Sequence, residues 1–570
     1  MHLILHYIKP HWKQMTFGMT IKLIGTVMDL LLPYILAHII DQIIPQGALK
    51  PVFLWGILML VCAAVAWIGN ILANRSASLV ARHAVFQIRH DLFEKIFQLS
   101  NRQVDSCTIP SLISRMTTDT YNLHRMIGMM QRIGIRAPIL VIGGILITWT
   151  LDPLLAAILL AMLPVMSIIV YRISRRSVPL FAILQEHIDE LVRTVRENVS
   201  GIRVIKALSK TEDEKKRFYE VNLGVCKAEN KANRTMAANS PVMNLILNLG
   251  LVLVVLVGAW RVNSGATGIG TITAFLSYFT IILNAMLTIT RVLTNYSRSL
   301  ASARRIQEVL DLPDDLLPEE RPGGFLQDAI HFDHVYFSYH HVHNNLENID
   351  FSLKKGQSLG ILGPTGAGKS TLAMLLMRFY DVDRGSILLG GKDLRTLSPA
   401  EIRGQFGVVF QNDQLFRDTI GENIRIGRAL SDLQLEEALR DAQAEQFVME
   451  KGGLSAPLEP KASNLSGGQK QRLLIARALA GHPPFLILDD SSSALDFKTD
   501  AALRRTLRDR YRETTKIIIA QRVSSVRHCD QILVLEEGRA LGLGSHEELL
   551  QSCPLYREIH MLQTGEEAAV

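Results

Sequence analysis

The sequence predicts two domains of different fold class, an all-α membrane domain followed by a soluble α/β domain. Three observations predict this division: six apolar segments in the first half, a change of composition after Arg305, and a strand, glycine loop and helix pattern in the second half. The length of 570 residues agrees, because single cores rarely grow beyond about 250–300 residues. We expect a membrane domain over residues 1–310, a linker rich in acid, Pro and Gly over 311–326, and a soluble domain over 327–570.

Each apolar segment has the length of about 20 residues that a helix needs to cross a bilayer. Apolar residues continue at helical spacing beyond the second segment, from Leu79 to Phe97. We therefore expect the membrane helices to extend into the cytoplasm, with breaks near residues 109–110 and 200–201. The predicted spans are residues 17–40, 52–73, 133–150, 154–173, 241–262 and 269–290.

The charge of the connections predicts the orientation of the chain. The connections at 41–51 and 150–153 are short and carry one cation between them, whereas those at 74–132 and 172–240 are long and basic. Because cytoplasmic connections carry the excess of Lys and Arg, we place both termini and the soluble domain in the cytoplasm, below a plasma (inner) membrane. The net charge of +7 is spread along the chain without a polybasic block, so nucleic acid is not an expected partner.

A glycine-rich loop lies between a short apolar run at residues 359–362 and a helical run that begins at Leu372. This is the context that a phosphate-binding loop requires, because glycines let several N–H groups converge and the helix start adds a positive dipole. We expect Lys369 on the β- and γ-phosphates of ATP and the Ser370 hydroxyl on Mg²⁺. The loop consists of Gly363, Pro364, Thr365, Gly366, Ala367, Gly368, Lys369, Ser370 and Thr371.

Two further motifs extend this site. The apolar run 485–488 ends in Asp489 and Asp490, which reads as a buried strand with carboxylates at the tip where open α/β sheets place ligands. Asp489 is suited to hold Mg²⁺, directly or through water, and Asp490 stands where a water-activating carboxylate would stand. A second, separate anion site is predicted at the helix start formed by Ser466, Gly467, Gly468 and Gln469.

Together these motifs resemble those of an ATP-binding-cassette domain, and with six membrane segments nearly the whole chain resembles a half-transporter of the exporter type. The resemblance implies a P-loop NTPase domain with a helical subdomain, in which residues 363–371 are the Walker A loop and 465–469 the signature. Gln411 then matches the Q-loop glutamine that touches Mg²⁺, Tyr339 the aromatic that stacks on adenine, and residues 493–496 the D-loop. In this family two cassettes meet head to tail, and each ATP lies between one Walker A loop and the other chain's signature.

Two residues depart from the family pattern. Asp490 stands where the active form has Glu, and Gln521 stands where it has the switch His. The shorter Asp carboxylate should lie about 1 Å or more from its best position, and misplacement on that scale can cost about 10²-fold in rate. Gln can hydrogen-bond a γ-phosphate, but it cannot carry a positive charge or relay a proton. We therefore expect a degenerate site that binds ATP and hydrolyses it poorly, as in the degenerate-site subunit of heterodimeric multidrug exporters.

The intact signature is expected to complete a competent site in a different partner chain that has the Glu and the His. Mostly apolar spans favour an amphipathic or hydrophobic substrate such as a drug. A homodimeric exporter of lipids, peptides or siderophores remains an alternative, as does an ATP-gated regulator or channel-like membrane protein. A soluble ATPase that acts on nucleic acid is opposed by the six spans.

Overall fold

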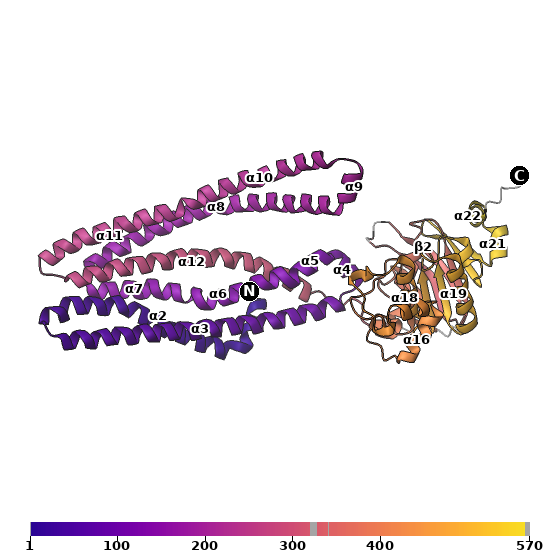
Figure 1. Ribbon diagram of the computed structural model, residues 1–570, viewed down its shortest axis with the longest axis horizontal. Helices are drawn as coiled ribbons and strands as arrows, with labels where there is room; N and C mark the ends of the chain where they lie inside the picture. The colour runs from indigo at the N-terminus through magenta and orange to yellow at the C-terminus, as the bar shows by residue number, and fades with distance from the viewer. Residues whose placement is uncertain (1, 320–327, 340, 342, 565–570) are drawn as a thin grey trace. The chain divides into compact units, whose positions relative to one another are not determined.

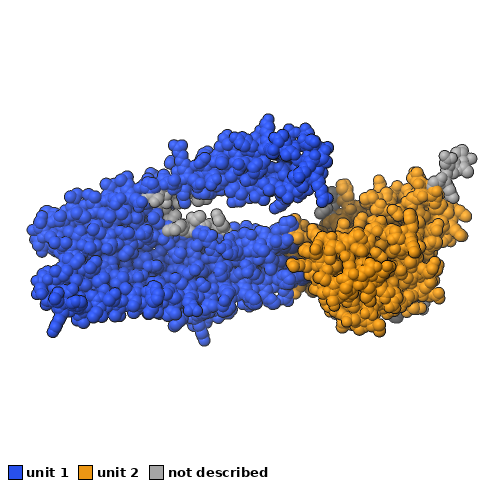
Figure 2. All heavy atoms as spheres, viewed as in Figure 1, with its two compact units in different colours: residues 1–97, 110–311 blue, residues 98–109, 312–570 orange. Residues whose placement is uncertain are grey.

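The computed structural model describes residues 2–319, 328–339, 341 and 343–564. It divides into two compact units, Met1–Phe97 with Pro110–Asp311, and Gln98–Ile109 with Leu312–Val570 (Figure 2). The end of the expected linker, residues 320–326, lies outside the described residues.

The first unit is entirely helical. Within the described residues, six helical segments are long and apolar enough to cross a membrane, and each predicted span lies in one of them, apart from residue 290 at the end of the sixth. The helices are α1 (His2–Ile8), α2 (Trp12–His38), α3 (Leu49–Gln98), α5 (Ile109–Ser114), α6 (Thr120–Met129), α7 (Arg136–Leu151), α8 (Pro153–Ser200), α9 (Ile202–Ala207), α10 (Thr211–Ala237), α11 (Asn239–Asn263) and α12 (Ile269–Leu310).

The expected helical extensions are present. At 1.5 Å per residue the 50 residues of α3 span about 75 Å, far more than the hydrocarbon core of about 30 Å. The predicted breaks also appear: Thr108 has a φ of +60° between α4 (Asn101–Cys107) and α5, and Gly201 separates α8 from α9. After the second break the chain returns as α10, which packs along α8 (Figure 1).

Polar side chains inside the membrane unit bind one another across helices. Arg136 of α7 forms an ion pair with Asp29 of α2 at 2.8 Å. The buried Lys22 amine donates to Asn70 at 2.8 Å and to Asn74 at 3.1 Å, both on α3. This pairing offsets the cost of placing charged groups in a membrane helix.

The second unit is an α/β domain. In its described residues, ten strands form one sheet in the order β5-β4-β1-β2-β10-β9-β3-β8-β7-β6. The strands are β1 (Ile330–Phe337), β2 (Leu346–Leu353), β3 (Ser358–Leu362), β4 (Arg384–Leu389), β5 (Lys392–Asp393), β6 (Phe406–Val409), β7 (Phe485–Asp489), β8 (Thr515–Ile519), β9 (Gln531–Glu536) and β10 (Arg539–Gly544). Besides α4, its helices are α13 (Lys369–Leu376), α14 (Pro399–Arg403), α15 (Ile420–Arg425), α16 (Asp432–Asp441), α17 (Glu445–Glu450), α18 (Gly467–Leu479), α19 (Phe497–Arg510), α20 (Val523–Val526), α21 (His546–Ser552) and α22 (Pro554–Thr564).

Strand β1 shows how the pattern of apolar residues sets the sheet. Ile330, Phe332, Val335 and Phe337 are all buried, although an unbroken alternation would turn the second pair to the other face. A register shift between Phe332 and Val335 inserts one residue and restores the inward direction. The helices α15 to α18 pack around a second buried core that includes Leu435, and they form the helical part of the domain.

The parallel strands position the functional residues. Strand β8 pairs in parallel with β3 and β7, so the carboxyl ends of all three strands meet at one edge of the sheet. The segments that follow these strands carry the glycine loop, Asp490 and Gln521. Three motifs that are far apart in the chain therefore reach the same edge.

Candidate functional site

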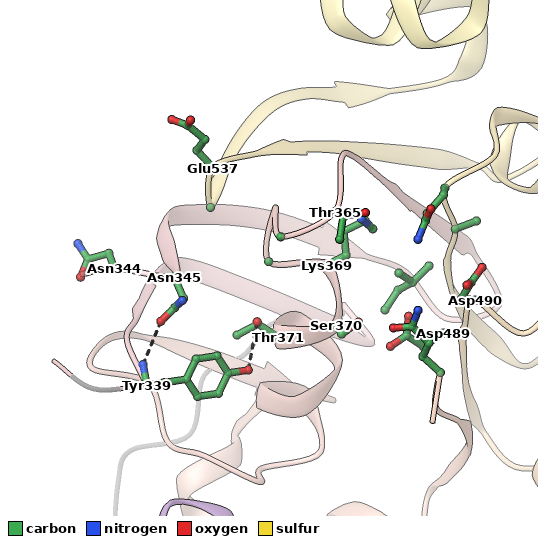
Figure 3. Close-up of a pocket in the computed structure, with 17 residues that line it drawn as sticks. Tyr339, Asn344, Asn345, Thr365, Lys369, Ser370, Thr371, Asp489, Asp490 and Glu537 are labelled. Carbon is green, nitrogen blue, oxygen red and sulfur yellow. Dashed lines mark hydrogen bonds between the residues drawn. The ribbon is translucent and has the colours of Figure 1, made fainter. Parts of the chain in front are cut away.

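A cavity of about 510 Å³ lies at the carboxyl edge of β3, β7 and β8 (Figure 3). Six residues of the phosphate loop face this one space, together with both acidic residues, Gln411 and Gln521. Its lining consists of Tyr339, Asn344, Asn345, Thr365, Gly366, Gly368, Lys369, Ser370, Thr371, Gln411, Asp489, Asp490, Ile519, Ala520, Gln521, Glu537 and Gly538. The remaining loop residues Gly363, Pro364 and Ala367 lie outside its described lining; Gly363 and Ala367 are buried, and Pro364 is exposed.

The glycine loop has the tight backbone that its sequence predicts. A Cβ atom on Gly363 would lie 2.1 Å from the carbonyl oxygen of Leu535, so the neighbouring strand leaves room for glycine alone. Gly368 has a φ of +93°, which L side chains rarely adopt, directly before the first residue of α13. The loop therefore turns into a helix start with its N–H groups at the cavity, an arrangement that fits bound phosphate.

Lys369 is held inside this loop. Its amine donates hydrogen bonds to the carbonyl oxygens of Gly363 at 2.8 Å and Pro364 at 2.7 Å. Burial lowers the pKa of Lys369, while the charges of Asp489 and Asp490 act in the opposite direction. The two hydrogen bonds place one positive charge in the wall of the cavity, where it can balance the charge of phosphate.

Three side chains whose oxygen atoms can coordinate a metal ion line the same cavity: Ser370, Gln411 and Asp489. Burial raises the pKa of the Asp489 carboxyl, the hydrogen bond from Ser370 lowers it, and the charge of Asp490 adds to the rise. Hydroxyl, amide and carboxylate oxygens are the ligands that Mg²⁺ prefers, together with water and substrate phosphate. The donor set therefore fits a magnesium ion.

The two departures from the family pattern meet at this site. The N–H of Asp490 donates to the carbonyl oxygen of Ile519 at 2.9 Å, so Asp490 is tied to the strand that leads to Gln521. The carbonyl of Gln521 accepts a hydrogen bond from the Gln563 amide of α22 at 2.8 Å, and the Gln563 side-chain oxygen accepts from the N–H of Val523 at 2.8 Å. Asp490 and Gln521 thus line one cavity, and a backbone hydrogen bond connects the two segments that carry them.

Tyr339 lies at the opposite side of the cavity from the acidic pair (Figure 3). Its hydroxyl donates to Thr371 at 3.2 Å, and its N–H donates to the Asn345 side chain at 3.0 Å. Phe337 and Tyr380 pack edge-on against its ring, with centroid distances of 4.9 and 5.2 Å. These contacts hold an aromatic ring in the wall of a polar cavity.

Sequence reasoning missed Asn344, Asn345, Glu537 and Gly538, which also line the cavity. The first two follow β1, and the second two form the tight turn between β9 and β10. A Glu-Gly pair between two apolar runs does signal a hairpin turn, but only the order of strands in the sheet brings that turn to the phosphate loop.

The signature residues lie apart from the described lining of this cavity, at the start of α18. The N–H of Gln469 donates to the Ser466 hydroxyl at 3.3 Å, and the Gln469 side chain accepts from the N–H of Ser466 at 3.0 Å. Ser466 and Gly467 are exposed, and a Cβ atom on Gly468 would lie 3.1 Å from the carbonyl oxygen of Ala494. This reciprocal cap leaves a solvent-facing helix start next to the 493–496 segment, as a second and separate place for an anion.

Comparison with known proteins agrees with this geometry. Residues 15–286 match the model of the ABC transporter transmembrane region, and residues 346–493 match that of the ABC transporter family. The chain is similar to the uncharacterized ABC transporter ATP-binding protein YfiB of Bacillus subtilis, with 33% identity over 99% of each chain. It is 29% identical to the multidrug efflux ATP-binding/permease protein of Mycobacterium bovis, over 97% of this chain and 46% of that one.

Among solved structures, it resembles that of a bacterial Atm1-family ABC exporter with ATP bound, with a TM-score of 0.82, 24% identity, and coverage of 98% of this chain and 99% of the other. The chain therefore belongs to the ABC transporter family, as a half-transporter with one membrane domain fused to one ATPase cassette in the exporter fold.

Proposed function

We propose that this chain is the degenerate-site subunit of a heterodimeric, ATP-driven exporter. The observation that carries the proposal is that Asp490 and Gln521 line the same cavity as Lys369 and Ser370. One substitution shortens the carboxylate that would take a proton from attacking water, and the other removes a group that can be charged. Both substitutions affect the hydrolytic step, and neither removes a phosphate-binding group. The cavity therefore keeps its affinity for ATP but hydrolyses ATP slowly.

The roles of the cavity residues follow from their chemistry. The 363–371 loop and Lys369 hold the phosphates, and the Tyr339 ring stacks on adenine from the position set by Asn345. Ser370, Asp489 and Gln411 hold Mg²⁺, which neutralises phosphate charge when it is bound. Asp490 and Gln521 orient water and the γ-phosphate less well than Glu and His would.

The exposed signature residues at the start of α18, which we call the signature surface, support the proposal that this chain completes a partner's site. Ser466 and Gly467 are exposed at a capped helix start and carry no substitution, so they can complete the nucleotide site of another cassette. We infer that the partner is a different half-transporter, with Glu at the position of Asp490 and His at the position of Gln521. ATP hydrolysis then occurs mainly at the site shared by this signature and the partner's phosphate loop.

The basic connections support a multi-pass protein of the plasma (inner) membrane with a cytoplasmic cassette, and with domain limits at residues 1–310 and 327–570. The mostly apolar spans and the multidrug efflux relative support amphipathic or hydrophobic compounds as the exported class.

The proposal is tested by the ATPase rate of the chain purified alone in nanodiscs and of the chain purified with the half-transporter encoded by a neighbouring gene. We expect slow turnover for the chain alone and a rate higher by about 10²-fold for the pair, lost when the partner's Glu at the position of Asp490 becomes Gln. Fast turnover of the chain alone that disappears in Asp490→Asn would instead identify a self-sufficient homodimer.

A flux measurement separates transport from gating. The pair should accumulate a hydrophobic dye in inside-out vesicles only when ATP is hydrolysed. Passive flux that a non-hydrolysable ATP analogue opens would identify an ATP-gated regulator or channel.

A further inference from the structure

A second cavity of the cassette, of about 690 Å³, lies at the opposite edge of the parallel strands. It is lined by residues at or near the starts of β3, β8 and β9, such as Ser358, Lys516 and Asp530, and by residues of α19. A five-residue strand separates its two ends by roughly 15 Å. The second cavity is therefore distinct from the nucleotide cavity at the carboxyl ends.

The lining of this second cavity is strongly basic. It contains one carboxylate, Asp530, which already accepts hydrogen bonds from the N–H and the hydroxyl of Ser358 at 2.7 Å each. The cations that line it are Arg504, Arg505, Arg508, Arg512, Lys516 and Arg527.

Most of these cations lack a carboxylate partner. Arg504 pairs with Asp500 at 2.6 Å and Arg508 with Asp509 at 3.3 Å. Within the described part of the chain, no carboxylate lies within ion-pair distance of the other four basic residues, Arg505, Arg512, Lys516 and Arg527. The cavity therefore has a large excess of positive charge that its own fold does not neutralise.

Lys516 is the least exposed of these cations, with 8% of its surface accessible. Its amine donates to the carbonyl oxygens of Tyr511 at 2.7 Å and Thr514 at 2.8 Å, and burial lowers its pKa. The charge of Asp530 acts in the opposite direction, but the hydrogen bonds of the ammonium go only to neutral carbonyls, so the buried charge remains costly. An anion in the cavity would add a second negative charge near it.

Three of the arginines lie close enough to His528 to change its pKa. Burial lowers the pKa of His528, and the charges of Arg527, Arg504 and Arg508 lower it further. These three arginines come from α19 and from the segment after α20, so two elements direct positive charge at one imidazole.

We propose that this cavity is a further anion site of the cassette, distinct from the phosphate loop and the signature, and that it binds a small ligand carrying two or three linked phosphate groups. Arginine guanidinium groups match phosphate oxygens in pairs, and several of them can share one polyphosphate. The volume of the cavity suits a small molecule, and its walls come from three strand starts and a helix, unlike the flat basic stripe that tracks a nucleic acid backbone.

Binding at this site can affect the nucleotide cavity, because α19 and α20 both contribute to the site and both begin near the nucleotide cavity. Helix α19 begins after Asp496 at the end of the 493–496 segment, and α20 begins two residues after Gln521. The Arg504 guanidinium donates to the carbonyl oxygen of Ser524 at 2.5 Å and so connects the two helices. The binding proposal does not depend on whether the exporter is a heterodimer.

The experiment is a calorimetric titration of the full chain in nanodiscs with inorganic tripolyphosphate, in a Lys369→Ala background that weakens the phosphate loop. We expect one binding event per chain, weakened by about 100-fold in the triple variant R505Q/R508Q/R512Q, because three of the six cations can then no longer pair with phosphate. The matched control R384Q/K392Q/R417Q removes three exposed cations of the same cassette outside the cavity, and it should change the affinity less than about threefold.

Hydrogen exchange on the unmodified chain provides a readout that does not depend on any variant. Tripolyphosphate should protect peptides that cover residues 501–512 and 525–530. Protection confined to residues 363–371, loss of all binding in Lys369→Ala, or equal weakening by the two triple variants would overturn the proposal. If ADP competes with tripolyphosphate in the Lys369→Ala background, the natural ligand is a nucleotide. If ADP leaves tripolyphosphate binding unchanged, the natural ligand is inorganic polyphosphate.

Discussion

The nucleotide cavity and the signature surface lie in the same cassette but are built in different ways. The cavity collects side chains from segments between Tyr339 and Gly538, whereas the signature is one run of consecutive residues, 465–469, whose helix start caps itself. Both departures from the family pattern fall in the cavity, and the signature has none. A site assembled from many segments can lose its hydrolytic groups while it keeps the phosphate loop, whereas the signature depends on a single local structure. The two half-sites can therefore change independently.

The largest expected effect comes from Gly468→Asp, which places a carboxylate at the helix start that we propose completes the partner's nucleotide site. The added Cβ would also lie 3.1 Å from the carbonyl oxygen of Ala494. We expect the ATPase rate of the co-purified pair to fall by about 10²–10³-fold, as when a single oxyanion donor is lost. Gln446→Asp adds the same charge at an exposed position of α17 and is the control. Equal rates in the two variants would show that the signature completes no active site.

The double variant Asp490→Glu with Gln521→His should remove the difference between this cavity and a competent one. We expect the ATPase rate of the chain alone to rise by about 10²-fold, because the carboxylate recovers its reach and the imidazole can carry charge. Each single variant should recover less ATPase activity than the double variant. An unchanged rate for the double variant would mean that another feature limits hydrolysis.

Lys369→Ala tests the part of the cavity that is intact. Removing a buried, hydrogen-bonded cation that faces phosphate should lower the ATP affinity of the isolated chain by about 30-fold. Equilibrium binding of a fluorescent ATP analogue measures this, with Lys392→Ala as the exposed control. In the pair, the variant should reduce the ATPase rate less than Gly468→Asp does. The opposite order would contradict the division of labour.

The smallest effect is expected at the adenine end of the cavity. Tyr339→Ala should weaken ATP binding by about tenfold through loss of stacking. Tyr339→Phe keeps the ring and loses the hydrogen bond to Thr371, so its affinity should fall less than about threefold. The same binding assay distinguishes them, and equal losses would show that the hydroxyl, not the ring, holds the nucleotide.

Local patterns predicted much of the fold. The glycine loop and the signature each depend on a few consecutive residues, and the structure has a helix start at both places, at Lys369 and at Gly467. The spans were predictable because a bilayer demands a continuous apolar length, and the extension of α3 because its apolar spacing continues to Phe97. The bulge in β1 was not predictable, since it depends on the pairing of β1 with two neighbouring strands.

The sequence by itself determined the family, the six spans, the phosphate loop and the identity of the two substituted residues, because each is written in a short run of residues with its own physical requirement. Only the tertiary structure decided that Asn345 and Gly538 belong to the cavity of Lys369, and that six cations meet at the opposite edge of the sheet. The physical reason is that parallel strands from distant parts of the chain lie side by side. Their order in the sheet, which no local pattern records, sets which loops become neighbours.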